Sequence, residues 1–304
     1  MKAIVFDNYL KQFKNINKYL NASIVNFEII KFKNGEGKIV LKESVKDEDV
    51  VIFSDFTYPL TYKYRGKKRV YSSDEYYVEL RRVINALDNP KSISVFLPLM
   101  YECRQNALND GESKDFEMFI SDLKHLGVNR IITFEAHGTH KKVESYSLAS
   151  LFSEYKYDVV VSPDNGGKKR AEEYAKFLGA HLCVFSKKRD LTKIVDGSNP
   201  IVEYFSEDYD FANKRVLIVD DILDSGTTLI SALTDIEGAS RVDICVCYAL
   251  FNKGLKNFKR AYKDKLFSKI YTSDLIYLNK QVKKCEFVEV LDTGKLVSEV
   301  IQWK

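Results

Sequence analysis

Short runs of β-branched and other apolar residues alternate with amphipathic helical stretches along most of this chain. The apolar runs predict strands at residues 50–53, 93–97, 130–134, 159–161, 216–219 and 244–249. Helical periodicity between them predicts helices at 74–87, 114–126, 168–178 and 228–236. Alternation of this kind is typical of strand–helix–strand units built on parallel strands. The sequence therefore predicts an α/β fold.

The same order of elements occurs once in each half: strand, helix, strand, and then a loop that carries an acid or a histidine. This repetition favours two similar domains, and 304 residues of which 45% are hydrophobic suffice for two medium-sized cores. We place the boundary in the polar stretch 140–145, which gives domains 1–142 and 143–304.

Charge and hydropathy narrow the classes of function. The 47 Lys and Arg residues are scattered among 43 Asp and Glu residues, which does not indicate binding to nucleic acid. No apolar run approaches the roughly 18 residues that a membrane-spanning helix needs, and the first seven residues lack the pattern of a secretory signal. The five cysteines match no disulfide or zinc framework, so we expect buried, reduced thiols. These features predict a cytoplasmic protein with no membrane contact.

The segment VLIVDDILDSGTTL at residues 216–229 is the strongest functional motif. Four apolar residues predict a buried parallel strand, Asp220 and Asp221 follow at its carboxyl end, and a turn of small residues leads into a helix. Backbone N–H groups and hydroxyls at the start of a helix favour an anion such as a sugar phosphate. An acidic turn that only caps a helix would explain Asp224 or Ser225, but not the two adjacent acids.

This segment resembles the phosphoribosyl pyrophosphate loop that type I phosphoribosyltransferases share with phosphoribosyl pyrophosphate synthetases. A second segment, VSPDNGGKKRA at 161–171, resembles a part of the second domain of the synthetases. The resemblance implies two similar type I phosphoribosyltransferase-like domains, each a mainly parallel sheet flanked by helices. It also implies that ribose 5-phosphate is bound by Asp220, Asp221, Asp224, Ser225, Gly226, Thr227 and Thr228.

Further matches to the synthetases concern the nucleotide. The segment FKNGE at 32–36 resembles a hairpin that reaches the adenine in a neighbouring subunit, where Phe32 would stack and Asn34 and Glu36 would form hydrogen bonds. Arg104 and Gln105 resemble the pair that holds the nucleotide. The resemblance thus implies ATP as a substrate and a homo-oligomer of at least two subunits; a hexamer is the usual state of the family.

Metal binding and catalysis are also implied by matching residues. His137 resembles a histidine that contacts both Mg²⁺ and the nucleotide, and Asp164 resembles the second metal-binding position. A histidine alone at a strand end is more often structural, and it is the paired Asp164 that favours a metal role. Lys187 and Arg189 resemble the start of a catalytic loop over 186–198; alternate residues of an extended segment share one direction, so both cations can reach one phosphate group.

The expected reaction moves the β,γ-diphosphoryl group of ATP to the C1 hydroxyl of ribose 5-phosphate. The chain departs from the common family pattern at Asn106, at Glu135, in the Ser-Gly-Thr-Thr form of the phosphate loop, and in a cationic loop at 61–70 that has the character of an insertion. Two alternatives remain open. One is a phosphoribosyltransferase, and the other is a non-catalytic regulatory relative of the synthetase.

Overall fold

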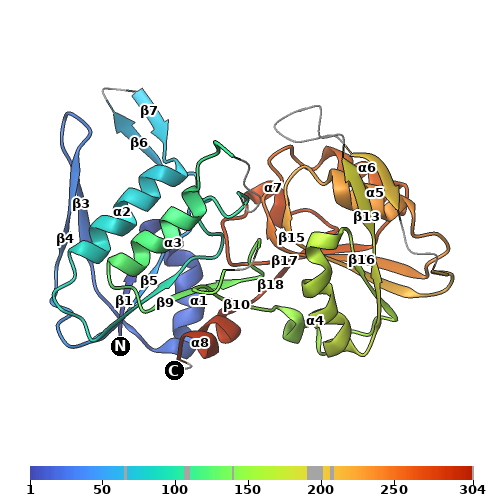
Figure 1. Cartoon of the computed structure of the whole chain (residues 1–304), viewed down its shortest axis with the longest axis horizontal. Helices are drawn as coiled ribbons and strands as arrows, with labels where there is room; N and C mark the ends of the chain where they lie inside the picture. The colour runs from blue at the N-terminus through green and yellow to red at the C-terminus, as the bar shows by residue number, and fades with distance from the viewer. Residues whose placement is uncertain (65–66, 106–109, 139, 190–200, 206–208, 303–304) are drawn as a thin grey trace. The chain divides into compact units, whose positions relative to one another are not determined.

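The computed structural model describes residues 1–64, 67–105, 110–138, 140–189, 201–205 and 209–302, which fold into two compact units (Figure 1). The first unit contains Met1–Tyr146, Asp274–Tyr277 and Asp292–Lys304, and the second contains Ser147–Ser273 and Leu278–Leu291. The chain passes between units four residues after the expected boundary at 142/143. Two short segments that we expected in the second domain belong to the first unit.

The first unit is built on a six-stranded sheet in which all neighbouring strands are parallel. Its order is β10 (Glu144–Tyr146), β9 (Arg130–Phe134), β8 (Ser92–Phe96), β5 (Asp49–Phe53), β1 (Lys2–Val5) and β2 (Ser23–Ile24). The helices of this unit are η1 (Asp7–Tyr9), α1 (Leu10–Leu20), α2 (Ser73–Asn85), α3 (Asp115–His125) and α8 (Gly294–Gln302).

Helices cover both faces of this sheet because successive side chains of a strand point to opposite sides. Val50 and Ile52 of β5 belong to a buried cluster that includes the apolar faces of α2 and α3. Phe53 instead meets Phe13 of α1, with ring centroids 4.9 Å apart. The sheet is therefore buried on both faces, which explains its continuous apolar strands.

Two antiparallel ribbons accompany the first sheet. One joins β3 (Phe27–Lys31) to β4 (Gly37–Leu41), and the other joins β6 (Thr61–Tyr64) to β7 (Lys67–Val70). The second ribbon corrects the expectation of a loop at 61–70. Its first strand is held to α2, because the Tyr62 hydroxyl donates to Glu75 at 2.6 Å and the Tyr62 ring packs edge-on against Tyr71.

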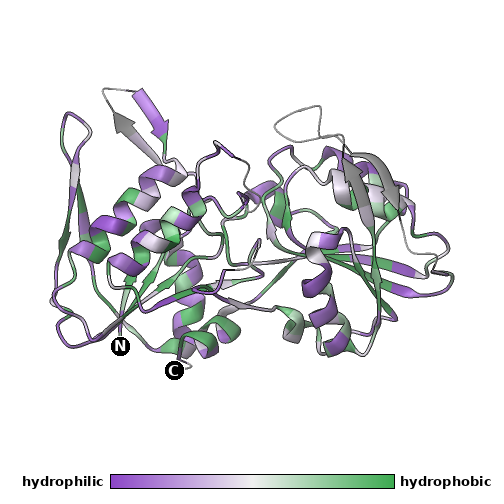
Figure 2. Cartoon of the chain, viewed as in Figure 1, coloured by the Kyte–Doolittle hydropathy of each residue, from purple (hydrophilic) through white to green (hydrophobic). Residues whose placement is uncertain are grey.

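The second unit contains another six-stranded, fully parallel sheet. Its order is β12 (His181–Val184), β11 (Val159–Ser162), β15 (Arg215–Leu223), β16 (Arg241–Ala249), β17 (Lys269–Ser273) and β18 (Val288–Leu291). Its other elements are η2 (Ala149–Phe152), η3 (Asn165–Gly167), α4 (Lys168–Leu178), α5 (Thr227–Thr234), α6 (Lys256–Lys263), α7 (Lys280–Lys283) and a ribbon of β13 (Ser186–Arg189) with β14 (Ile201–Phe205). In Figure 2 the central strands are coloured mostly as hydrophobic, whereas much of α4 is coloured as hydrophilic.

All six predicted strands and all four predicted helices are present, and their ends agree to within a few residues. The α/β class and the mainly parallel sheets are thereby confirmed. All five cysteines lie in the described part of the chain and none forms a disulfide. None of the described helices has the length and hydropathy that crossing a membrane would require.

The last helix, α8, packs on the first unit rather than on the sheet that precedes it in the chain. Gly294 lies so close to α1 that an added Cβ would sit 2.9 Å from the Asn15 side chain. At the other end of α8, the guanidinium of Arg130 donates to the carbonyl oxygens of Val300 and Ile301, both at 3.1 Å. These carbonyls lack partners within the helix, and a cation at a helix carboxyl end is favoured.

Candidate active site

The two adjacent acids lie within β15 and not after it. The predicted strand ended at residue 219, but pairing with β16 continues from Asp220 opposite Val246 to Leu223 opposite Ala249. The apolar pattern ends at Val219, so local hydropathy could not predict the extension. Asp220 is half-buried and Asp221 is buried, which places both carboxylates in a rigid, partly desolvated setting.

Arg170, from the first turn of α4, holds both carboxylates. Its Nη2 lies 2.7 Å from Asp221 Oδ2, and its Nη1 lies 3.7 Å from Asp220 Oδ1. The Arg170 side chain is only 10% exposed, so this is a largely desolvated ion pair rather than a surface contact. Arg170 was not among the site residues predicted from the sequence. Its place in the segment 161–171, after the strand next to β15, was the signal that could have found it.

Charges around Asp220 affect its protonation. Burial and the neighbouring charge of Asp221 raise the pKa of the Asp220 carboxyl well above its ordinary value, and Asp164 adds to the rise while Arg170 opposes it. Asp164 follows β11, the strand beside β15, and its Oδ1 accepts a hydrogen bond from the Gly167 N–H at 3.1 Å. Three carboxylates and one guanidinium thus act on one another at this edge of the second sheet. Their excess negative charge suits a cation or the donating hydroxyls of a sugar.

The phosphate loop follows these acids and leads into α5. Gly226 has φ 77° at the N-cap of α5, a left-handed conformation that favours glycine. An added Cβ at Gly226 would lie 2.1 Å from Cζ of Phe258, a fully buried residue of α6. The hydroxyls of Ser225 and Thr227 lie 3.2 Å apart. The packing of Phe258 from α6 therefore leaves no space for a side chain at Gly226. The hydroxyls lie near the start of a different helix, α5, where an anion is favoured.

The expected adenine hairpin forms at the tip of the β3–β4 ribbon. Gly35 has φ 97°, and the Phe32 N–H donates to the Glu36 carbonyl at 2.7 Å. The Asn34 side chain accepts from the Glu36 N–H at 3.2 Å. The Phe32 ring is 48% exposed, which is unusual for a large aromatic side chain.

Of the other residues expected to contact the nucleotide, Gln105 has partners within the chain. It donates to the Ser113 hydroxyl at 3.2 Å and accepts from the Asp115 N–H, the first residue of α3, at 2.9 Å. Arg104 is exposed beside it. Asn106 lies outside the described residues.

His137 lies after β9, in the first unit, and is half-buried. The strand ends at Phe134, and the next residue, Glu135, is buried with φ 41°. A left-handed backbone at a residue other than glycine costs energy and is common at functional sites. His137 and Asp164 belong to different units. In the described part of the chain, no three His, Cys, Asp or Glu side chains come together as a metal cluster.

The backbone of Lys187 and Arg189 belongs to β13, which pairs with β14. The first residues of the expected catalytic loop are therefore a strand, while 190–198 lie outside the described residues.

A parallel sheet, paired acids on a central strand and a small-residue loop at a helix start define a phosphoribosyltransferase-like protein, and residues 135–283 match the family model of the phosphoribosyl transferase domain. Residues 1–127 match the N-terminal domain of ribose phosphate pyrophosphokinase. The chain belongs to the ribose-phosphate pyrophosphokinase family.

Relatives from other organisms align with almost the whole length of this chain. A ribose-phosphate pyrophosphokinase of Mycoplasma genitalium is 30% identical over 309 residues, covering 95% of this chain and 86% of the relative. One from Mycoplasma pneumoniae is 28% identical, covering 89% of this chain and 82% of the relative. The crystal structure of phosphoribosylpyrophosphate synthetase from Mycobacterium smegmatis has the same fold, with a TM-score of 0.77 over 99% of this chain and 97% of that one at 22% identity.

Proposed function

We propose that this chain transfers the β,γ-diphosphoryl group of ATP to the C1 hydroxyl of ribose 5-phosphate, giving phosphoribosyl pyrophosphate and AMP for nucleotide biosynthesis. The observation that carries the proposal is the acid pair on β15, held by Arg170 and followed by the phosphate loop. A phosphoribosyltransferase also has such a loop. The match of residues 1–127 to the N-terminal domain of the pyrophosphokinases favours the synthetase.

In this proposal ribose 5-phosphate binds along the end of β15. Its phosphate lies at the start of α5, against the segment Asp224, Ser225, Gly226, Thr227 and Thr228, where N–H groups and hydroxyls can donate to it. The ribose hydroxyls donate to Asp220 and Asp221. Fixing the sugar in this way would aim its C1 hydroxyl at the β-phosphorus, and positioning is the main contribution that phosphoryl-type transfer asks of a protein.

ATP is assigned to Phe32, Asn34, Glu36, Arg104, Gln105 and His137. The exposed Phe32 ring at the ribbon tip supports stacking on an adenine. Because the ribbon can present that ring to another subunit, we propose a homo-oligomer of at least two chains, acting in the cytoplasm. The contacts that Gln105 makes to Ser113 and Asp115 give it a second role, which is to fix the start of α3 beside Arg104.

His137 and Asp164 are the proposed protein contacts of Mg²⁺. The raised pKa of Asp220 in the field of Asp221 and Asp164 indicates that this edge of the sheet would gain from a divalent cation. When bound, Mg²⁺ would neutralise charge on the phosphates. Lys187 and Arg189 are proposed to neutralise the charge that develops on the transferring group.

AMP formation tests the function directly. Purified protein with ATP, ribose 5-phosphate and Mg²⁺ should release AMP only when the sugar phosphate is present. Asp221→Asn should abolish most of this release, whereas Glu237→Gln, an exposed control on the same unit, should retain it. A protein that yields no AMP but consumes phosphoribosyl pyrophosphate with a nucleobase is a transferase. One that does neither, yet binds a ligand, is a regulatory relative.

A further inference from the structure

The β6–β7 ribbon encloses the side chain of Lys31, the residue that precedes the proposed adenine hairpin. The Lys31 ammonium lies 4.9 Å from the centroid of the Tyr71 ring and 5.6 Å from that of Tyr62. Tyr62 belongs to β6, and Tyr71 directly follows β7. The same ammonium pairs with Glu79 Oε1 of α2 at 2.8 Å. We call Tyr62, Tyr71 and Glu79 the Lys31 cage.

The members of the Lys31 cage also hold one another in place. Glu79 is 1% exposed, and its Oε1 accepts a second hydrogen bond from the Tyr71 hydroxyl at 2.9 Å. The Tyr62 ring packs edge-on against Tyr71, and its hydroxyl donates to Glu75 at 2.6 Å. An ammonium over aromatic faces and beside a desolvated carboxylate is held more firmly than one in a surface pair.

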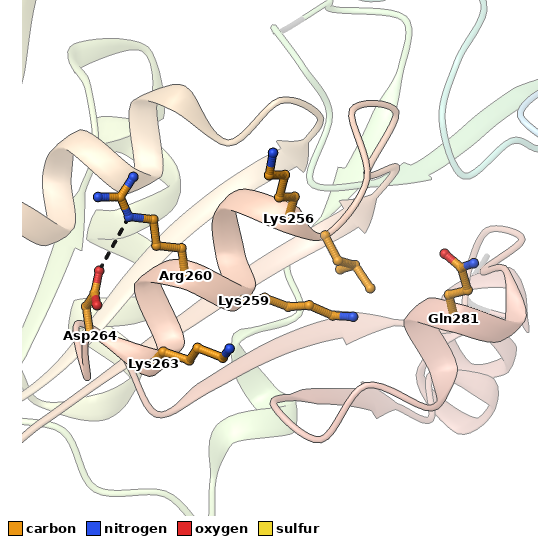
Figure 3. A pocket seen from close by; sticks show the side chains of 7 residues that line it. Lys256, Lys259, Arg260, Lys263, Asp264 and Gln281 are labelled. Carbon is orange, nitrogen blue, oxygen red and sulfur yellow. Dashed lines mark ion pairs between the residues drawn. The ribbon is translucent and has the colours of Figure 1, made fainter.

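Other lysines of the chain show the difference. Lys42 pairs with Glu28 at 2.7 Å at the base of the β3–β4 ribbon, but the two side chains are 49% and 55% exposed. Figure 3 shows Lys259 and Lys263 of α6 beside a pocket whose lining, among the described residues, includes no aromatic ring. The enclosure of Lys31 is therefore a property of its place on the ribbon and not of lysines in general.

The position of Lys31 determines the direction of Phe32. Successive side chains of a strand point to opposite faces, so a Lys31 side chain held against α2 directs the next side chain away from α2. The 48% exposure of the Phe32 ring agrees with this direction. Strand pairing continues through Phe32, whose N–H donates to the Glu36 carbonyl.

The other strand of the ribbon meets α2 at the same level. Gly37 is opposite Lys31 in the strand register. An added Cβ at Gly37 would lie 2.9 Å from Nη1 of Arg82, which is one turn of α2 beyond Glu79. Both strands are thus in contact with α2 immediately before the hairpin tip.

A hairpin that presents one ring to a ligand needs such contacts. A two-stranded ribbon is only marginally stable by itself in water, and movement lost on binding reduces affinity. Figure 1 shows both ribbons beside α2. The β6–β7 ribbon has the character of an insertion in the sequence, and the Lys31 cage gives this insertion a role.

We propose that the β6–β7 ribbon positions the adenine hairpin: Lys31, held by Tyr62, Tyr71 and Glu79, is a positioning residue that fixes Phe32 for stacking on the base of ATP. The effect on ATP rests on the proposed function. The effect on the hairpin itself does not.

Hydrogen exchange of the free protein tests the effect on the hairpin. In Lys31→Met the Phe32 amide should exchange about tenfold faster or more, because an ion pair and two cation–π contacts that restrain the tip are lost. The matched control, Lys42→Met, removes the exposed pair at the ribbon base and should change this rate by less than about twofold. Lys31→Arg keeps a cation that can pair with a carboxylate and lie over a ring, and should stay within about threefold of the wild type.

A second variant covers the case in which Lys31→Met does not fold. Lys31→Met/Glu79→Gln removes both charges and leaves no buried carboxylate without its cation, and it should show the same faster exchange. Exchange at the wild-type rate in the folded variants, or equal acceleration in Lys42→Met, would overturn the inference.

Steady-state kinetics test the effect on ATP. Lys31→Met should raise the KM for ATP about tenfold and leave kcat and the KM for ribose 5-phosphate within about twofold, because only the binding of the nucleotide is affected. Lys31→Arg should restore the KM for ATP. In a Phe32→Ala background, Lys31→Met should add less than about twofold, because Lys31 acts through that ring.

The two kinds of failure are distinguishable. An equal rise in the KM for ribose 5-phosphate, or an undiminished effect of Lys31→Met in the Phe32→Ala background, would indicate general destabilisation and refute the positioning role. A wild type that forms AMP, with a Lys31→Met variant of unchanged KM, would refute this inference alone. A wild type that forms no AMP would refute the proposed function, and hydrogen exchange would still decide whether the Lys31 cage holds the hairpin.

Discussion

At the residue scale, Arg170 is the counter-ion of two neighbouring carboxylates on one strand, those of Asp220 and Asp221. Burial and mutual repulsion raise the pKa of Asp220 beside Asp221, and the charge of Arg170 opposes that rise. The two terminal nitrogens of one guanidinium reach Asp220 and Asp221 separately, which keeps both side chains in fixed positions. Arg170 is therefore a positioning residue for the proposed sugar site.

Replacing either acid should reveal which ligand it serves. Asp221→Asn, and to a smaller extent Asp220→Asn, should weaken ribose 5-phosphate binding by about tenfold or more, because a hydrogen bond to a charged group is lost. The Kd of ATP should stay within about twofold. Calorimetric titration with each ligand separately measures both. A comparable loss for ATP would contradict the assignment of these acids to the sugar.

Asp55 predicts a pH dependence of stability in the first unit. Burial raises the pKa of its carboxyl to about 6, even though the N–H groups of Thr57 and Tyr277 donate to it. Between about pH 4 and 6 the folded chain holds the proton more tightly than the unfolded chain, so this contribution to stability is lost as the pH rises through that window. The lost contribution is about 3 kcal/mol for a shift of about two pH units.

The measurement is urea unfolding of the wild type and of Asp55→Asn at a series of pH values. The stability of the wild type relative to the variant should fall from pH 4 to 6 and then level off. Asp88→Asn, an exposed control, should leave the pH profile of the wild type unchanged. A relative stability that stays constant or rises over this window would show that Asp55 titrates as an ordinary acid.

At the scale of elements, the contact between the phosphate loop and α6 fixes the geometry at the start of α5. Gly226 needs both its left-handed backbone and the absence of a side chain, because Phe258 fills the space beside it. Gly254 provides a natural comparison. It has φ 75°, but nothing lies within 4 Å of an added Cβ.

Gly226→Ala should therefore destabilise the protein more than Gly254→Ala. Both variants incur backbone strain of about 1 kcal/mol or more, and the first also incurs a clash worth a further 1–3 kcal/mol. It should also weaken ribose 5-phosphate binding, while Gly254→Ala should not. Chemical unfolding and calorimetry measure the two effects. Adding Phe258→Ala to Gly226→Ala should restore part of the ligand affinity; no recovery would mean that backbone strain alone is responsible.

At the scale of the whole molecule, the β3–β4 ribbon predicts an active site shared between subunits. Phe32→Ala should raise the KM for ATP, and Lys187→Ala should lower kcat on the order of a hundredfold, as expected for loss of a group that stabilises developing charge. At an ATP concentration far below the raised KM both variants are impaired, and mixing them should restore part of the activity, because a subunit with Lys187 intact can receive Phe32 from its neighbour.

The matched control replaces Phe32→Ala by the double variant Phe32→Ala/Lys187→Ala, which leaves no mixed oligomer with a complete site. Exchange of subunits is followed independently by labelling one protein and recovering the other. If exchange occurs and the mixture stays inactive, Phe32 serves its own subunit or no subunit at all.

The sequence by itself determined the fold class and the family. Strand and helix periodicity are local properties, so the runs at 130–134 and 168–178 matched β9 and α4 residue for residue. The role of residues 224–228 as a phosphate loop was also predicted from the sequence, because its chemistry depends on neighbouring residues in one turn, and this role stays a prediction.

Only the tertiary structure decided the features that depend on distant residues. Arg170 meets Asp221 across 51 positions, and α8 returns to Arg130 across about 170. The extension of β15 through two acids and the ribbon at 61–70 likewise depend on partners: a neighbouring strand in one case and α2 in the other. One physical reason applies to these four features, which are the Arg170 ion pair, the contact of α8 with Arg130, the extension of β15 and the ribbon at 61–70. A charged or polar residue is stable in a desolvated position only where a partner satisfies it, and local sequence does not specify that partner.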